Sequence, residues 1–361
     1  MARIDRYLQT LVSAQGSDLH LSAKRLPHMR VHGVIQPLPG ENELSSDDVL
    51  GLLKEFLPQE NFGELLSSND TDCAYAIAGL ARFRVNGFKD INGYGTVIRV
   101  IPDRIPTFEE LNLPNVLKEF CMLSKGLVVV TGPTGSGKST TLAAMVDYIN
   151  RNRSEHLITI EDPVEFVHKP AKCIVNQREI HRDTVSFSCA LRAALREDPD
   201  IVLVGEIRDL ETMEIALETA ETGHLVFATL HTNTAVSTVE RMVDKFPANR
   251  QNQIRSMLAD ALKGVVAQTL CKKVGGGRVA AMEVLIVNSP VAALIREAKT
   301  HMLPSVIQTS KNVGMQNFGD ELARLAARGV ITAEEAYIKA VDKADLETKF
   351  RLAGVTFKKI V

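Results

Sequence analysis

Tryptophan is absent from this sequence of 361 residues, and aromatic side chains make up only 5% of it. Proteins that bind single-stranded nucleic acid usually stack the bases on aromatic rings. The formal net charge of −2 also provides no broad basic surface for a polyanion. The composition therefore argues against a nucleic-acid motor, and we expect no nucleic-acid partner.

Cysteine is scarce as well. None of the five cysteines lies in a C-x-x-C pair, which excludes a zinc ribbon and favours reduced thiols buried in the core. The five are Cys73, Cys121, Cys173, Cys189 and Cys271.

The sequence also lacks a long hydrophobic run. No segment approaches the roughly 18 apolar residues that a transmembrane helix requires, and the first residues contain no apolar core of a signal peptide. We therefore expect a cytoplasmic protein that does not insert directly into a membrane.

What the sequence does contain is a phosphate-binding loop that matches the pattern G-x-x-x-x-G-K-[ST]. Its residues are Gly132, Pro133, Thr134, Gly135, Ser136, Gly137, Lys138 and Ser139. An apolar, β-branched segment at 127–131 precedes the loop, and helical spacing begins at Thr140. A strand, a glycine-rich turn and a helix N-terminus direct backbone N–H groups towards one anion. We predict a nucleoside triphosphate site over residues 132–140, with Lys138 on the β- and γ-phosphates and the Ser139 hydroxyl on Mg²⁺.

Two further apolar segments end in carboxylates. Residues 201–204 lead to Gly205 and Glu206, and residues 158–160 lead to Glu161. Ligands gather at the carboxyl ends of strands in open α/β sheets, so both acids are expected near the phosphates. Because Gly205 replaces the usual metal-binding Asp, Glu206 is predicted to polarise the attacking water or to hold Mg²⁺ through a water. Glu161 is predicted to lie near the hydrated Mg²⁺. A surface glutamate and a solvated acidic turn are the alternatives.

Two histidines, His224 and His231, bracket another apolar segment. A strand of this length separates its ends by about 20 Å, so the two side chains cannot share a metal ion. His231 follows the carboxyl end and is predicted to sense phosphate charge. A structural role remains open for both.

Positive charge against the transferred phosphoryl group often comes from a neighbouring subunit. The candidates in the first hundred residues and just after them are Arg82, Arg84, Arg99 and Arg104. We expect Phe83, Val85 and Val97 to share one face of a sheet, which leaves Arg84 and Arg99 on the other. A solvated strand face is the alternative.

The pattern of elements changes along the chain. Residues 1–101 mix helices with strands that pair in antiparallel fashion, and a proline-containing linker is predicted at 102–114. Residues 115–290 alternate short strands with helices, which indicates an α/β domain with a parallel sheet. Residues 291–361 are predicted to be helical.

The phosphate-binding loop, the acidic run after residue 160, Glu206 and the 224–231 segment together resemble the motifs of the secretion-superfamily ATPases. The resemblance covers nearly the whole chain. It implies a RecA-like P-loop NTPase core with an N-terminal α+β PAS-like domain and a C-terminal helical extension, and a ring of six chains with ATP between subunits. It also matches Arg84 and Arg99, and less closely Arg104, to positions that reach across the subunit interface.

Within the superfamily, residues 16–22, 82–88 and 306–309 resemble the type IV pilus retraction branch. The four-cysteine zinc element of extension and type II secretion ATPases is absent, and the C-terminal retraction motif is matched only in part, at 291–297. The resemblance implies a homohexamer that hydrolyses ATP with Mg²⁺ to power pilus retraction. It also implies a peripheral location at the inner membrane, where the hexamer would act on a platform protein. Pilus extension, type II secretion, nucleic-acid translocation and ATP binding without turnover are the alternatives.

Overall fold

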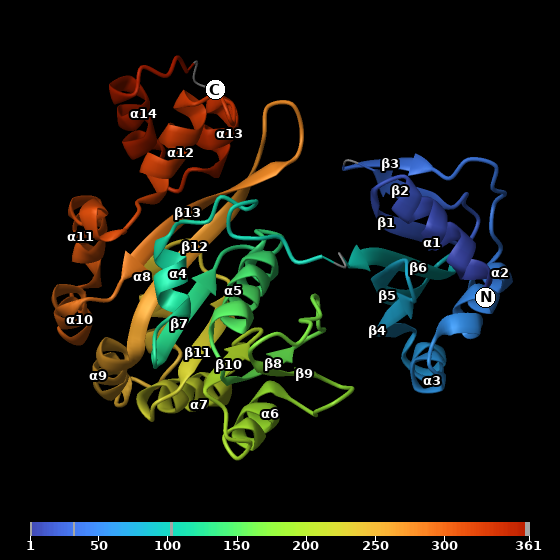
Figure 1. Ribbon diagram of the computed structural model, residues 1–361. Coiled ribbons are helices and arrows are strands. Elements are labelled where there is room, and N and C mark those ends of the chain that lie inside the picture. The colour runs from blue at the N-terminus through green and yellow to red at the C-terminus, as the bar shows by residue number, and fades with distance from the viewer. Residues whose placement is uncertain (1, 32, 102–103, 358–361) are drawn as a thin grey trace. The chain divides into compact units, whose positions relative to one another are not determined.

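The structure is a computed structural model that describes residues 2–31, 33–101 and 104–357 (Figure 1). Contacts within the chain divide it into an N-terminal unit, Met1–Arg104, and a C-terminal unit, Ile105–Val361. The predicted linker at 102–114 begins with two residues, 102 and 103, that lie outside the described part. Each unit has its own sheet and its own hydrophobic core.

The N-terminal unit is a six-stranded antiparallel sheet with the strand order β3-β2-β1-β6-β5-β4. Its strands are β1 (Gly16–Ser22), β2 (His28–Val31), β3 (Val34–Pro37), β4 (Asp70–Ile77), β5 (Ala81–Asp90) and β6 (Gly93–Ile101). Its helices are α1 (Arg3–Ser13), α2 (Ser46–Phe56) and α3 (Gln59–Ser68). The predicted α+β module is therefore present.

The register of β5 and β6 decides which side chains share a face. Arg84 pairs directly with Arg99, so the two arginines lie on one face as expected. The expectation for Val97 is wrong. Val97 pairs with Asn86, on the arginine face, whereas Ile98 pairs with Val85 and is fully buried in the core. The predicted inward-facing residue was one position too early, because Val97 and Ile98 are both apolar and either could face the core.

The C-terminal unit is built on a seven-stranded sheet with the order β13-β12-β7-β11-β10-β8-β9. Its strands are β7 (Gly126–Thr131), β8 (His156–Glu161), β9 (Ile174–Glu179), β10 (Ile201–Val204), β11 (Leu225–Leu230), β12 (Leu262–Lys272) and β13 (Arg278–Ile286). In this spatial order, the six strands from β12 across to β9 run parallel to one another. Strand β13 pairs with β12 in antiparallel fashion, so the sheet is mixed at this edge rather than wholly parallel.

Helices cover both faces of this sheet, as the continuous apolar strands require (Figure 1). Leu127 and Val129 face the core that contains α6, α7, α8 and α9, whereas Val128 and Val130 face the core of α4 and α5. The bounds are α4 (Val116–Cys121), α5 (Lys138–Asn152), α6 (Phe187–Ala194), α7 (Leu210–Glu221), α8 (Ala235–Asp244) and α9 (Gln251–Ala261).

After β13 the chain is helical, as predicted. The helices are α10 (Ser289–Arg296), α11 (Leu303–Thr309), α12 (Phe318–Ala327), α13 (Ala333–Lys339) and α14 (Lys343–Leu352), with short 3₁₀ turns at Thr300–Met302 and Lys311–Val313. Helices α12 to α14 form a separate small core against β12 and β13. Helix α14 begins after the N-cap Asp342, whose side chain accepts from the N–H of Asp345 at 2.9 Å.

The cysteines are free thiols, and three of them are buried: Cys121, Cys173 and Cys271. The expectation of burial is wrong for Cys189, which is exposed on α6, and Cys73 is half-buried. Within the described residues, no helix combines the length and apolarity needed to cross a bilayer.

Candidate active site

The phosphate-binding loop runs from the end of β7 to the start of α5 (Figure 1). Three of its glycines have positive φ angles: +144° at Gly132, +76° at Gly135 and +88° at Gly137. A Cβ atom on Gly132 would lie 2.2 Å from the carbonyl oxygen of Gln268 in β12. Glycine is therefore required at residue 132 for both its conformation and its closeness to the neighbouring strand.

Lys138 begins α5 and is buried. Its Nζ donates to the carbonyl oxygens of Gly132 at 2.8 Å and Pro133 at 3.2 Å, and lies 3.4 Å from His231 Nδ1. Burial lowers the pKa of Lys138, and the carboxylates of Glu206 and Glu165 partly offset this effect. The ammonium group thus lies at the loop backbone, where it can exchange carbonyl oxygens for phosphate oxygens.

One buried polar atom beside the loop, a hydroxyl that can donate, fits a phosphate ligand. The Ser136 hydroxyl is buried and has no hydrogen-bond partner among the described residues. The neighbouring Gln268 donates through Nε2 to the Ser136 carbonyl at 2.8 Å, and its own Oε1 is likewise unpartnered there. A buried donor without a partner is costly, so a bound phosphate would satisfy Ser136. Sequence reasoning missed Gln268, because β12 lies far along the chain.

Glu206 and His231 meet at the carboxyl ends of β10 and β11. His231 Nε2 lies 2.9 Å from Glu206 Oε1, while Nδ1 of the same ring faces Lys138. The predicted base, the predicted histidine and the P-loop lysine therefore form one continuous chain of contacts. His224, at the opposite end of β11, faces the Thr219 carbonyl through Nδ1 at 3.1 Å, which matches the structural alternative.

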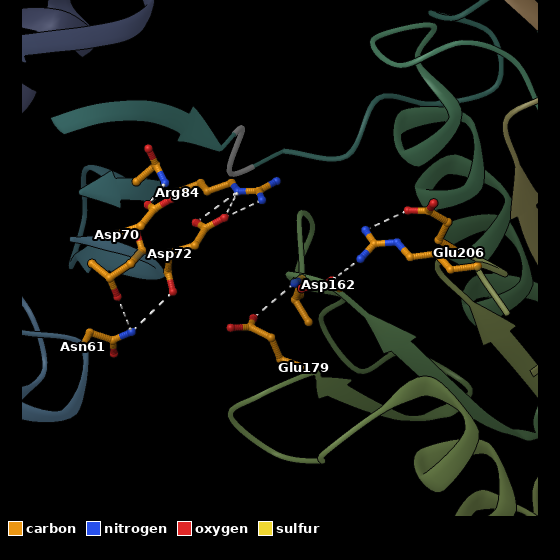
Figure 2. Close-up of polar contacts among 11 residues, drawn as sticks. Asn61, Asp70, Asp72, Arg84, Asp162, Glu179 and Glu206 are labelled. Carbon is orange, nitrogen blue, oxygen red and sulfur yellow. Dashed lines mark hydrogen bonds and ion pairs between the residues drawn. The ribbon is translucent and has the colours of Figure 1, made fainter. Parts of the chain in front are cut away.

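Arg208 was missed by the sequence analysis, although it lies only two residues beyond Glu206. Its Nη2 contacts Glu206 Oε2 at 2.9 Å, and its Nη1 contacts Asp162 Oδ2 at 3.1 Å (Figure 2). Burial alone would raise the pKa of Glu206, but Arg208 and His231 outweigh it and leave that pKa below its ordinary value. The carboxylate is therefore ionised, with both oxygens in contact with partners.

Glu161 ends β8, next to β10. Its Oε1 accepts from Thr159 Oγ1 at 2.7 Å and from Gln177 Nε2 at 3.2 Å. Desolvation raises the pKa of Glu161 to about 7. A Cβ atom on Gly205 would lie 3.2 Å from the Cα of Glu161, so the glycine allows the two strand ends to approach. The hydrogen-bond partners of Glu161 lie on β8 and β9 rather than in the P-loop.

Mg²⁺ retains most of its water ligands and requires few protein oxygens. The hydroxyl of Ser139 and the carboxylates of Glu206 and Glu161 are hard oxygen donors of the kind it prefers. In the part of the chain that is described, no three His, Cys, Asp or Glu side chains gather into a metal-binding group. Both oxygens of Glu206 contact Arg208 and His231, so contact through a water suits Glu206 better than direct ligation.

Threonines hold the segment that carries His231 against the P-loop strand. Thr131, the last residue of β7, donates through Oγ1 to the Thr232 carbonyl at 2.8 Å, and the Thr232 N–H donates back to Thr131 Oγ1 at 2.9 Å. The hydroxyls of Thr232 and Thr238 are 2.7 Å apart, which extends the attachment to α8. This network was also missed, because threonine is common in strands for other reasons.

The predicted arginines lie in the N-terminal unit, where carboxylates hold two of them. Arg84 donates through Nε to Asp72 Oδ2 at 3.1 Å (Figure 2). Arg99 donates through Nε to the buried Asp18 at 2.8 Å. Arg104 is exposed and is the last residue of the unit. Their action on a phosphate stays a prediction.

Comparison with known proteins matches residues 4–337 to the family model described as type II/IV secretion system protein. The chain is 51% identical over 324 residues to the type IV pilus retraction ATPase PilT of Pseudomonas aeruginosa, which covers 90% of this chain and 94% of that protein. It is 42% identical to the type IV pilus ATPase PilU of the same organism, over 97% of this chain and 92% of that protein. A crystal structure of the pilus retraction motor PilT with bound ADP superposes with a TM-score of 0.89 at 44% identity, covering 96% of this chain and 99% of that one.

Proposed function

The chain belongs to the type II/IV secretion system protein family, and we propose that it is an ATPase that powers the retraction of type IV pili. The observation that carries the proposal is the continuous set of contacts from Lys138 through His231 to Glu206, at the end of a P-loop. The similarity to a retraction ATPase over nearly the full length of the chain indicates that the process is pilus retraction.

In this proposal the P-loop backbone and Lys138 bind the β- and γ-phosphates of ATP. Glu206 orients and polarises a water molecule, whose oxygen attacks the γ-phosphorus while the bond to the ADP oxygen breaks. His231 touches both Lys138 and Glu206, so it links phosphate binding to the position of the base. Mg²⁺, held by Ser139 and through water by Glu206 and Glu161, would neutralise charge on the phosphates when bound.

We further propose that the ATPase acts as a homohexamer, with Arg84, Arg99 and Arg104 of one copy directed to the nucleotide of the next. The support is the resemblance of these positions to interface arginines, together with the placement of Arg84 and Arg99 on one sheet face. The ring would act on a platform protein of the inner membrane, as a peripheral cytoplasmic motor.

The test uses a piliated bacterium that expresses this chain. Deletion is expected to leave surface pili that extend but do not retract, with loss of twitching motility. Wild-type protein should restore retraction, and Glu206→Gln at equal abundance should not. Loss of surface pili on deletion would instead point to an extension ATPase, and unchanged retraction would refute the proposal.

A further inference from the structure

One carboxylate outside the nucleotide site lies between the starts of two helices. Glu283, in β13, is 7% exposed. Its Oε1 accepts from the backbone N–H of Ala235 at 2.8 Å, and the backbone N–H of Phe318 lies near enough to the carboxylate to lower its pKa. Ala235 is the first residue of α8, and Phe318 is the first residue of α12.

The N-cap residues satisfy the next amides of the same two helices. Thr234 Oγ1 accepts from the Ser237 N–H of α8 at 3.1 Å, and Asn317 Oδ1 accepts from the Gly319 N–H of α12 at 2.9 Å. Glu283 therefore satisfies the first amide of α8 and lies at the first amide of α12. Two helix N-termini place partial positive charge on one carboxylate, which offsets part of the cost of burying it.

The two helices belong to different parts of the C-terminal unit. Helix α8 directly follows the 231–234 segment, which contains His231 and is hydrogen-bonded to Thr131 of the P-loop strand. Helix α12 opens the small core formed by α12, α13 and α14. Glu283 thus lies between the segment beside the nucleotide site and the start of the C-terminal helices.

We propose that Glu283 is a positioning residue of the nucleotide site, which joins the segment carrying His231 to the start of α12 so that nucleotide binding is transmitted to the C-terminal helices. This inference rests on the proposed ATPase function. In this proposal Glu283 does not contact ATP and acts through the backbone of α8.

Other contacts hold each helix start separately. The segment before α12 pairs with β13 through two backbone hydrogen bonds between Gln316 and Val284, at 2.9 and 3.0 Å. The start of α8 is held by the contact between Thr232 and Thr238. Removing the charge of Glu283 should therefore separate the two helix starts without unfolding either. Burial raises the pKa of Glu283, and the Ala235 and Phe318 amides and Lys349 of α14 act in the opposite direction.

The experiment compares the full-length wild type with Glu283→Gln by hydrogen exchange, with and without MgADP. In the wild type, MgADP should slow exchange both at residues 231–240 and at residues 314–324. In Glu283→Gln, only residues 231–240 should respond. The kcat for ATP should fall roughly tenfold while KM changes less than about twofold, because positioning affects the reacting geometry more than ground-state binding.

A second variant and a matched control sharpen the test. Ala235→Pro removes the N–H that Glu283 accepts, at a helix position that tolerates proline, and should give the same loss of response at 314–324. Glu321→Gln removes another buried carboxylate of α12, which pairs with Arg324, and should preserve the response. A response at 314–324 that persists in Glu283→Gln and Ala235→Pro, or that is absent in the wild type, overturns the inference. Absence of phosphate release by the wild type would instead refute the proposed function.

Discussion

At the scale of single residues, the Glu206 carboxylate is held at both oxygens, by His231 on one side and Arg208 on the other. These contacts keep it ionised and fix its direction. A base that polarises water must be positioned closely, and small displacements reduce the rate strongly. If Glu206 polarises the attacking water as proposed, Arg208 contributes to the reaction by orienting it, and Asp162 holds Arg208 in turn.

Arg208→Gln is expected to lower kcat for ATP by roughly tenfold or more, because a charge-assisted contact that orients Glu206 is lost. KM should change little, since the contacts of Arg208 are with Glu206 and Asp162 rather than with the P-loop. Steady-state phosphate release measures both constants. The control is Arg192→Gln, which breaks an exposed pair with Glu211 and should leave kcat unchanged. Equal kcat values for the two variants would contradict this role.

His168 provides a prediction about pH and stability. It is buried, and burial lowers its pKa to about 4. The ordinary value is 6.5, so between pH 6.5 and 4 the unfolded chain binds a proton that folded His168 does not. Its contribution to stability is present above pH 6.5 and is lost as the pH falls through this window, by about 3 kcal/mol at most.

His168→Leu cannot be protonated, so it should lose less stability than the wild type between pH 7.5 and pH 4.5. Thermal melting at several pH values measures this difference. Melting temperatures of the two proteins that fall in parallel would show that His168 does not titrate as described.

The sequence predicted several site residues and missed others for a physical reason. Lys138 was predicted from the P-loop pattern. Glu206 and His231 were predicted because each follows an apolar strand segment, and strand ends meet in a parallel sheet. Arg208 was overlooked because an exposed arginine in a loop gives no periodic signal. Val97 was assigned to the wrong face because two adjacent apolar residues permit either register.

At the scale of elements, the P-loop is a short sequence pattern, but the strand that packs against it comes from a distant part of the chain. Strand β12 lies beside β7 and places Gln268 against the loop, although the two segments are far apart in sequence. Strand β12 was not predicted, because Lys263, Gly264 and Gln268 interrupt its apolar residues. Strand β9 was missed because it is a polar edge strand.

Gly132→Ala and Gly135→Ala test whether β12 constrains the P-loop. An alanine at residue 132 would press its Cβ against a backbone carbonyl of β12, whereas one at residue 135 would meet nothing within 4 Å. Both positions have positive φ. Gly135→Ala should cost about 1 kcal/mol from its backbone conformation alone. Gly132→Ala should cost roughly 2 to 4 kcal/mol because overpacking adds to the strain. Urea unfolding measures both changes; equal costs would mean that β12 does not constrain the loop.

At the scale of the whole molecule, the change from mixed elements to alternating strands and helices was sufficient to predict an α+β unit followed by an α/β unit. The order of strands was not predictable, because pairing depends on contacts between distant segments. The site described in the C-terminal unit contains the P-loop, Lys138 and Glu206, while the predicted interface arginines belong to the N-terminal unit.

If Arg84 acts on the nucleotide of a neighbouring copy, two inactive variants should complement each other. Lys138→Ala and Arg84→Ala are each expected to be inactive alone. Mixed and reassembled in equal amounts, they should recover about a quarter of wild-type phosphate release, because random assembly pairs an intact P-loop with an intact arginine at about one interface in four. A mixture that remains inactive would indicate that Arg84 does not act between copies.

The most direct test of ATP hydrolysis at Glu206 is phosphate release with MgATP, measured for the wild type and Glu206→Gln together with fluorescent nucleotide binding. The substitution preserves the size of the side chain but removes the carboxylate that polarises water. We predict that kcat falls by roughly a hundredfold or more, while nucleotide affinity changes less than about threefold. Phosphate release by Glu206→Gln at the wild-type rate would contradict the account.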